Sequence, residues 1–302
     1  MGVAAAVVVA AAVVVLALRI VPRDHGKAAA SQTDGRFAQT STRTRARSTR
    51  HAPRHHARPA RLPNPLTAAS ARAFLATRSG TVTAAVDDLK TGQTWVLHPG
   101  IRDQTASIMK ADILETLLHQ AEGSHSPLDD ETSGLVQGMI ENSSDTDAQD
   151  LWDTIGGSGA VGAYDASIGM SQTVPDDDGY WGESTTSAAD QIRLLRQLVD
   201  SHGALDHASQ TYELGLMENV EADQAWGVSA GVPSGVSVAL KNGWVPLTSD
   251  TDWEINSIGR IRGDGQWYLI AVLTAHDPSQ DYGIDTVQGL SRIVWSSLAA
   301  GT

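Results

Sequence analysis

The spacing of apolar residues predicts two kinds of element after residue 65. Strands show alternating apolar and polar residues, and helices show apolar residues three or four positions apart. Five segments have the strand pattern: residues 81–86, 94–97, 236–240, 253–261 and 267–274. Seven segments have the helical pattern: residues 66–77, 129–140, 146–155, 158–167, 187–201, 205–217 and 282–298. Their order predicts an α+β fold, an antiparallel five-stranded sheet flanked by helices with an inserted all-helical lobe.

A further helix is expected at residues 106–118, and it carries the first candidate chemistry. Met109, Ile113 and Leu117 recur every four residues and mark its buried face. Ser107 stands in the first turn, among free backbone N–H groups, and Lys110 follows three residues later on the same face. A neutral amine beside a hydroxyl can accept its proton and make a nucleophile. The alternative is an N-cap serine followed by a solvated lysine.

Residues 141–148 form a polar segment just before the predicted helix at residues 146–155. Ser143 and Ser144 are its candidate functional hydroxyls. Serine and aspartate also gather before helices as ordinary caps, so the pattern alone leaves both interpretations open.

Lys241 closes the apolar strand at residues 236–240 and is followed by Asn242, Gly243 and Trp244. This order puts a fixed cation beside accessible backbone, although an ordinary strand end is the alternative. Residues 62–302 contain three lysines, and they are Lys90, Lys110 and Lys241. Lys90 falls in the predicted hairpin turn, and arginine could not replace the other two as bases, because it does not release its proton. The use of lysine at these two positions therefore favours proton-transfer chemistry.

Charge is divided unevenly along the chain. Residues 1–61 hold 11 Lys and Arg against 2 acids, whereas residues 62–302 hold 11 against 33. The acidic part argues against nucleic acid as a partner.

The sequence has no cysteine, which excludes disulfides, thiolate metal sites, cysteine catalysis and a cysteine-linked lipid within it. The ten histidines show no metal-ligand spacing, so we expect no metal and no organic cofactor.

The first 27 residues are predicted to be a signal peptide or membrane anchor. Residues 3–18 contain only Ala, Val and Leu, a run between the usual lengths of a signal core and a membrane span. No Lys or Arg precedes this run, so we expect the natural start to differ from Met1. Residues 28–31 offer a small-residue cleavage site. We expect a secreted or membrane-anchored protein on the extracytoplasmic face; the alternative is a cytoplasmic tethered protein, favoured by the basic residues after the run.

Residues 28–64 are predicted to be a disordered basic linker before a folded domain at residues 65–302. The stretch at residues 32–61 has one large apolar residue, Phe37, and six closely spaced arginines at residues 43–58. Such a composition cannot bury enough apolar surface to fold. The linker is a solvated tether or a segment that binds anionic surface polymers or lipid head groups.

The three polar motifs together resemble the active-site set of class A β-lactamases and penicillin-binding serine peptidases, S-x-x-K, a Ser-Asp-Asn-like element and K-x-G in that order. The resemblance implies a β-lactamase/transpeptidase-like fold. It implies Ser107 as nucleophile, Lys110 as its proton acceptor, and the second-motif serine as proton relay. Lys241 would attract a substrate carboxylate, and the backbone N–H groups of Ser107 and Trp244 would form an oxyanion hole.

Several positions depart from the family pattern. Counting back from Gly156 assigns the relay to Ser143, while a register one residue later gives Ser144. In the preferred register Asp145 stands where the family has asparagine, so a substrate-facing N–H donor is lost. Asn242 replaces threonine or serine, and its amide could still donate to a carboxylate. Gly243 and Trp244 complete the expected substrate-binding set.

The family's Glu-x-x-Leu-Asn element, whose glutamate activates the deacylating water, is missing. The loop at residues 169–184 is too short for it, and its only glutamate, Glu183, is expected to begin the next helix. Asp176, Asp177 and Asp178 are interpreted as a solvated turn. The resemblance implies an acyl-enzyme with a β-lactam or a peptidoglycan stem peptide, with slow deacylation.

Two other functions remain open. One is a catalytically degraded member that binds wall peptide or a partner in the same cleft, and the other is an esterase or peptidase outside cell-wall chemistry. We expect a monomer in each case.

Overall fold

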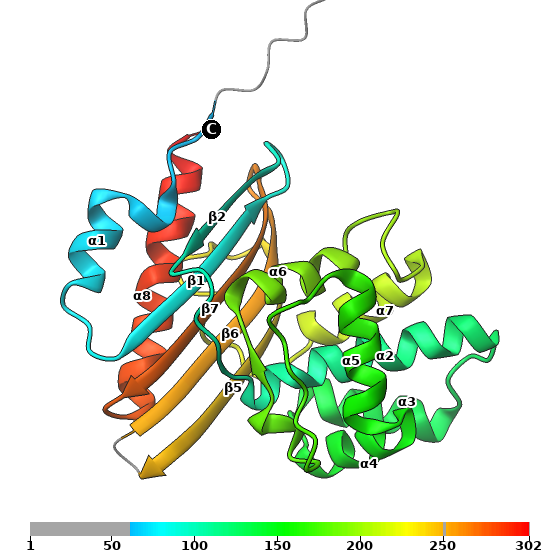
Figure 1. The fold of residues 1–302 in the computed structure, drawn as a ribbon. Helices are drawn as coiled ribbons and strands as arrows, with labels where there is room; N and C mark the ends of the chain where they lie inside the picture. Colours follow the sequence, from blue (N-terminus) through cyan, green and yellow to red (C-terminus); the bar gives the residue numbers. More distant parts are fainter. Residues whose placement is uncertain (1–60, 250–251, 302) are drawn as a thin grey trace, which may run out of the picture. The chain divides into compact units, whose positions relative to one another are not determined.

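The computed structural model describes residues 61–249 and 252–301. Its centre is one antiparallel sheet made of β1 (Thr81–Asp88), β2 (Gln93–Leu97), β5 (Ser237–Ser249), β6 (Asp252–Gly263) and β7 (Gln266–Asp277). The strand order is β2-β1-β7-β6-β5, so the early hairpin pairs with the last strand (Figure 1). The predicted five-stranded antiparallel sheet is confirmed.

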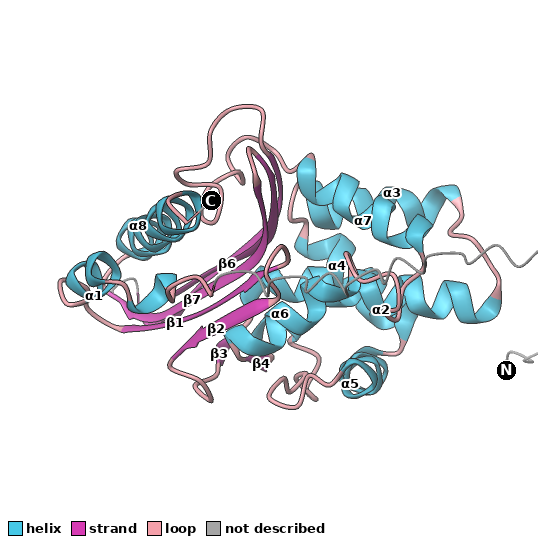
Figure 2. Ribbon diagram, turned by 90° about the horizontal axis from the view of Figure 1, so that it is seen from above, coloured by secondary structure: helices cyan, strands magenta, loops and turns pink. Residues whose placement is uncertain are grey.

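The helical lobe lies between β2 and β5 in the sequence, as predicted. It contains α2 (Met109–Ser124), α3 (Asp130–Glu141), α4 (Asp145–Ile155), α5 (Gly157–Ile168) and α7 (His207–Glu218). Between the lobe and the sheet lies α6 (Ala188–Gln197), while α1 (Ala69–Leu75) and α8 (Gln280–Ala299) cover the opposite face of the sheet (Figure 2). The fold is that of an α+β protein with helices on both sheet faces.

The apolar run in β7 shows why both faces are covered. Leu269, Ala271 and Leu273 point to the core shared with the helical lobe, whereas Ile270 and Val272 point to the core under α1 and α8. Successive residues of a strand face opposite sides. A strand buried on both faces therefore has a continuous apolar run instead of simple alternation.

Three differences from the predicted element boundaries lie near the three polar motifs. β5 continues through the Lys-Asn-Gly-Trp motif to Ser249, because the motif pairs with β6 in register. Thr185–Thr186 forms strand β4, which pairs with β3 (Asp103–Gln104). Helix α6 begins only at Ala188, where the Ser187 side chain accepts a hydrogen bond from the Asp190 amide.

The amino-terminal predictions fall on residues that the structure describes only in part. The expected anchor at residues 1–27 and most of the linker at residues 28–64 lie outside the described residues. Three residues before the expected domain start, the Leu62 amide donates to Gln93 Oε1 at 2.7 Å, and its carbonyl oxygen accepts from Gln93 Nε2 at 3.1 Å. Across residues 61–249 and 252–301, no helix combines the length and apolar character required to span a membrane.

Candidate active site

Ser107 lies where a short 3-10 helix, η2 (Ala106–Ile108), leads into α2. Ala106 has a φ of 45°, so the backbone bends through the left-handed region immediately before the serine. Lys110 is completely buried one turn later, and its Nζ lies 3.0 Å from Ser107 Oγ. The structure thus brings together the two side chains that the sequence spacing put on one helix face.

Ser143, and not Ser144, points into this site. Ser143 has a φ of 57° in the turn between α3 and α4, and its Oγ lies 3.1 Å from Lys110 Nζ. Its carbonyl oxygen is 2.6 Å from the same nitrogen. Ser144 is the N-cap of α4, where its hydroxyl accepts from the Asp147 amide at 3.3 Å. The geometry therefore favours the Ser143 register.

The edge strand β5 supplies the third motif. Lys241 is buried, and its Nζ donates to Ser143 Oγ at 2.9 Å and to the Asn242 carbonyl at 3.1 Å. Gly243 lies against η2 so closely that a Cβ there would be 2.7 Å from the Ser107 amide nitrogen. Only glycine fits this approach. The backbone of β5 is thereby held beside the serine, with Trp244 next along the strand.

Asn242 does not present its amide to the site. Its Nδ2 donates to the carbonyls of Gln224 and Trp226, at 2.7 and 3.1 Å, and the residue is 1% exposed. Both N–H hydrogens are thus used by the loop before β5. The expectation that this amide donates to a substrate carboxylate is corrected, because tertiary contacts have taken its donors.

Asp145 forms an ion pair with Lys110, with Oδ1 2.6 Å from Nζ. Burial lowers the pKa of Lys110, while the hydrogen bond and charge of Asp145 and the charge of Asp147 raise it. Burial, and then repulsion by Lys110, lowers the pKa of Lys241 well below its usual range, with Asp145 acting in the opposite direction. Of the two lysines, Lys110 has the carboxylate in direct contact, and Lys241 has only uncharged hydrogen-bond partners.

A cavity of about 360 Å³ opens beside the serine. Its lining residues come from η2, α4, β5 and the loop before β4: Ala106, Ser107, Asp145, Gln149, Gly179, Tyr180, Trp181, Gly182, Glu183, Trp244 and Val245. The Trp181 ring centre lies 4.9 Å from Lys110 Nζ, within the range of a cation–π contact. An indole ring of the loop therefore covers the amine that faces Ser107.

The loop at residues 169–184 differs from its sequence interpretation at Glu183. This residue belongs to a 3-10 helix, η3 (Trp181–Glu183), at the cavity wall, and does not begin α6. Asp176 Oδ1 accepts from the amides of Asp178 and Tyr180, both at 3.0 Å, so it holds the loop's own shape. Within the part of the chain that the structure describes, no group of acids and histidines is arranged to hold a metal ion.

Sequence reasoning missed the loop aromatics Tyr180 and Trp181 and the helix residue Gln149, all of which line the cavity. The aromatic pair did carry a signal, because it stands between Gly179 and Gly182 in an otherwise polar loop. Gln149 follows Asp145 by one helical turn and so points to the same side of α4.

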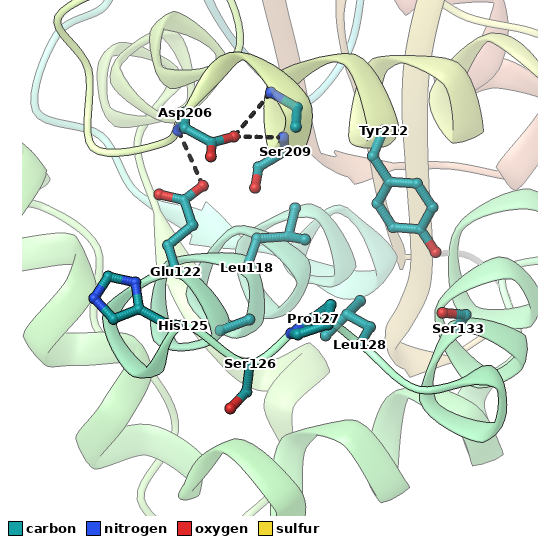
Figure 3. Close-up of a pocket in the computed structure, with 12 residues that line it drawn as sticks. Leu118, Glu122, His125, Ser126, Pro127, Leu128, Ser133, Asp206, Ser209 and Tyr212 are labelled. Carbon is teal, nitrogen blue, oxygen red and sulfur yellow. Dashed lines mark hydrogen bonds between the residues drawn. The ribbon is translucent and has the colours of Figure 1, made fainter.

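A larger cavity lies elsewhere, at the far end of α2. It has a volume of about 560 Å³ and lies among α2, α3 and α7, with Leu118, Leu128 and Tyr212 in its walls (Figure 3). Its polar rim is already bonded to protein: Glu122 accepts from the Asp206 amide at 2.9 Å. None of the three motifs contributes a residue to it, so size alone does not locate the chemistry.

Comparison with known proteins identifies the family, with a family model that matches the chain after Ser107 and Lys110. A family model described as "Beta-lactamase enzyme family" matches residues 131–298. The protein named "Putative lipoprotein LppW" from Mycobacterium tuberculosis is 29% identical over 212 residues, covering 68% of this chain and 66% of the relative. The same-named protein of Mycobacterium bovis matches equally. The chain thus spans just under two thirds of the length of the curated relatives that it matches.

Solved structures show the same fold. A class A β-lactamase from Bacteroides cellulosilyticus superimposes with a TM-score of 0.67 at 18% identity, covering 76% of this chain and 95% of that one. PBP-A superimposes with a TM-score of 0.67 at 17% identity, covering 80% and 99%. Because the family model covers more than half of the sequence, the protein belongs to the beta-lactamase enzyme family.

Proposed function

We propose that this protein is an exported active-site serine hydrolase that forms an acyl-enzyme on Ser107 and releases the acyl group slowly. The observation that carries the proposal is the series of contacts from Ser107 Oγ to Lys110 Nζ, Ser143 Oγ and Lys241 Nζ, at 3.0, 3.1 and 2.9 Å. A nucleophile, a proton acceptor and a relay lie within hydrogen-bonding reach of one another. The substrates are β-lactams or the D-alanine peptides of the cell wall. A mutant of PBP-A, which has the same fold, has been crystallised as an acyl-enzyme with penicillin G.

In the proposed acylation, Ser107 Oγ attacks the amide carbonyl carbon and its proton passes to the neutral amine of Lys110. The tetrahedral intermediate then collapses, and the C–N bond breaks. Ser143 gives its proton to the leaving nitrogen and recovers one from Lys110. One amide has been replaced by one ester on Ser107, and one proton has moved from the serine to the leaving group.

The two lysines divide the required protonation states between them. Burial, and then repulsion by the ammonium group of Lys110, lowers the pKa of Lys241. With one proton shared over the pair, one lysine is the neutral acceptor and the other is the cation that attracts a substrate carboxylate.

The closeness of Gly243 to the Ser107 amide supports an oxyanion hole made by the backbone N–H groups of Ser107 and Trp244. Such donors stabilise the negative charge that develops on the carbonyl oxygen. Removal of one donor typically costs about 10²–10³ in rate.

Slow deacylation is supported by the loop residue that covers Lys110. Trp181 stands there, and an indole can donate a hydrogen bond but cannot take a proton from water. A general base typically contributes about 10²–10⁴ in rate. Without one on the loop at this point, hydrolysis of the ester is the slow step.

We extend the proposal to the location of the protein and to its domains. Residues 1–27 would target or anchor it outside the cytoplasm, residues 28–64 would be a basic tether able to attract anionic surface polymers, and residues 65–302 would be the hydrolase domain. The apolar run at residues 3–18 supports this, as does the lipoprotein name of the mycobacterial relatives.

One observation favours a second function, binding without turnover. Asp145 holds its carboxylate against Lys110, which stabilises the ammonium form and makes the amine a poorer acceptor. If that state persists with ligand bound, the cleft would hold wall peptide or a partner without cutting it.

Intact-mass measurement after incubation with benzylpenicillin separates the two functions. The proposal predicts a stable adduct with the mass of one intact penicillin on the wild-type chain and none on Ser107→Ala. Binding without any adduct would favour the non-catalytic function.

A further inference from the structure

We propose that the cavity beside Ser107 selects acyl donors that carry an ammonium group close to the scissile carbonyl. The inference rests on the proposed function, since it names the substrate class of the same site. Two carboxylates, Asp145 and Glu183, and three aromatic residues line this cavity, and its lining residues include no lysine, arginine or histidine.

The two side chains of the ion pair at the cavity wall differ strongly in their exposure to solvent. The Lys110 side chain is 0% exposed, whereas that of Asp145 is 79% exposed. A ligand in the cavity therefore meets the anion of the pair, while the cation is covered by Trp181 and by its own helix. The buried lysine reduces the field of the carboxylate but does not offer a cationic surface to an acyl group.

The hydrogen-bonding character of Asp145 points to the same ligand. An asparagine at this position could donate N–H to an acceptor on the substrate, but an ionised carboxylate can only accept. One oxygen of Asp145 is bonded to Lys110 Nζ at 2.6 Å. The remaining acceptor capacity can be satisfied only by a donor from the ligand or from water, and an ammonium group is the strongest such donor.

The loop before β4 adds a second carboxylate and aromatic surface to the cavity lining. Glu183 is exposed on η3, and Tyr180 beside it is 64% exposed. Trp181 and Trp244 complete the aromatic lining. Carboxylates together with aromatic faces are a combination that holds alkylammonium groups. With a volume of about 360 Å³, the cavity is near the small end of ligand sites and suits an amino-acid-sized side group.

A matched set of penicillins tests this selectivity. Ampicillin carries an ammonium group on its acyl side chain, benzylpenicillin has no charge there, and carbenicillin carries a carboxylate. Acylation rate constants of the full chain are measured by intact mass at low ionic strength. We expect ampicillin to exceed benzylpenicillin by roughly tenfold, and benzylpenicillin to exceed carbenicillin by a similar factor, as one charge contact of about 4 Å would give.

The double variant Asp145→Asn/Glu183→Gln should reduce both ratios to within about twofold, and high salt should shrink them in the wild type. Asp150→Asn, an exposed acid on the same helix as Asp145, is the matched control and should keep the order. Equal rates for the three penicillins in the wild type, or ratios unchanged in the double variant, would overturn the inference.

Failure of the proposed function gives a different result. If none of the penicillins forms an adduct, Ser107 is not acylated, and calorimetric binding of the three compounds to Ser107→Ala then tests the charge preference alone. Tighter binding of ampicillin than of carbenicillin supports the inference, and equal binding contradicts it.

Discussion

Helix α2 contributes residues to two polar clusters on successive turns, and these clusters stabilise their ionisable groups in opposite ways. The reactive cluster consists of Ser107, Lys110, Ser143, Asp145 and Lys241. The acid cluster consists of Asp112, Glu115, Asp165 and Glu213. The first opens to a cavity, and the second is sealed inside the helical lobe.

Opposite charges are paired in the reactive cluster. Lys110 has four hydrogen-bond partners, three of them oxygens of Ser143 and Asp145. Burial of an ammonium group is costly unless such partners replace water. This cluster therefore keeps a charge inside the protein by pairing it.

Four carboxyl groups lie together in the acid cluster. In the described residues, no lysine or arginine is bonded to any of these carboxyl groups. Burial, and then the charge of neighbouring Asp165, raises the pKa of Asp112, which favours a proton on one of the two carboxyl groups. Glu115 accepts from the Tyr164 hydroxyl at 2.6 Å. Burial raises the pKa of Asp112, Glu115 and Glu213 well above the usual range and, with the charge of Asp190, raises that of Asp165 to about 7.

The contrast shows two ways to bury ionisable groups under one helix. The reactive cluster stabilises charge by pairing, and the acid cluster avoids charge by retaining protons. A rise in pH should help Lys110 to accept a proton and should, at the same time, destabilise the lobe that positions Lys110. Activity and stability should thus respond to pH in opposite directions.

The largest effect is expected from Lys110→Ala, which removes the charge centre of the reactive cluster. Loss of the proton acceptor should lower the acylation rate by about 10²–10⁴, measured with a fluorescent penicillin. The matched control is Lys90→Ala at the exposed β1–β2 turn, which should label like the wild type. Similar labelling of both variants would remove Lys110 from the mechanism.

Next in size is the pH dependence of folding, which tests the acid cluster. Unfolded Asp and Glu release their protons near pH 4, but the folded cluster retains them to higher pH. Between these pH values the unfolded chain binds fewer protons, so the free energy of unfolding falls as pH rises. The loss is about 1.4 kcal/mol per pH unit for each retained proton, and for Asp165 it ends near its folded pKa of about 7.

Urea unfolding from pH 4 to pH 8 measures how the free energy of unfolding changes with pH. One variant tests whether the acid cluster causes this slope. Asp112→Asn keeps the shape and a donor but has no proton to lose, so its slope should be shallower than that of the wild type. Asp285→Asn, an exposed acid on α8, should leave the slope unchanged. A wild-type stability that rises across this range would mean that the cluster is ionised and paired in another way.

A smaller effect is expected from Asp145→Asn, which removes the negative partner of Lys110. Because the carboxylate raises the pKa of Lys110, its loss should move the acidic limb of the acylation pH profile to lower pH. At pH 6 the rate with benzylpenicillin should rise roughly two- to fivefold, as for a largely exposed ion pair. An unchanged profile would show that the pair does not control the amine.

Removal of residues 1–60 should have the smallest effect on either cluster. Residues 32–61 have one large apolar residue, Phe37, so they can add little to a core. Residues 61–302 should melt within a few degrees of the full chain and acylate at the same rate. Early melting or aggregation of the shorter chain would move the domain boundary towards the amino terminus.

The fold was largely predictable because local spacing already determines most of it. The apolar residues at 81–86 and at 106–118 identified a strand and a helix, although both are buried on more than one face: β1 is buried from Val82 to Asp88 and α2 from Met109 to Leu118. Boundaries depended on tertiary pairing, which spacing does not encode: β5 extends to Ser249 because β6 pairs with it, and Thr185–Thr186 is a strand because β3 lies beside it.

The site was predictable only where its residues lie close together in the sequence, in short motifs. Ser107 and Lys110 share a helix face, so their contact follows from their spacing. The contacts of Asp145 with Lys110 and of Trp181 over its amine join segments 35 and 71 residues apart, which no local pattern specifies. The acid cluster was hidden for another reason: an acid on a helix is normally exposed, and only the packing of α5 and α7 on α2 buries Asp112 and Glu115.

A rapid-quench time course with nitrocefin tests the central claim most directly, that Ser107 is acylated faster than it is freed. The account predicts a burst of one equivalent of hydrolysed chromophore, an adduct on Ser107 by mass, and slow turnover afterwards. Steady turnover at roughly tens per second without a burst would contradict it, because another residue of the cavity would then be activating the water.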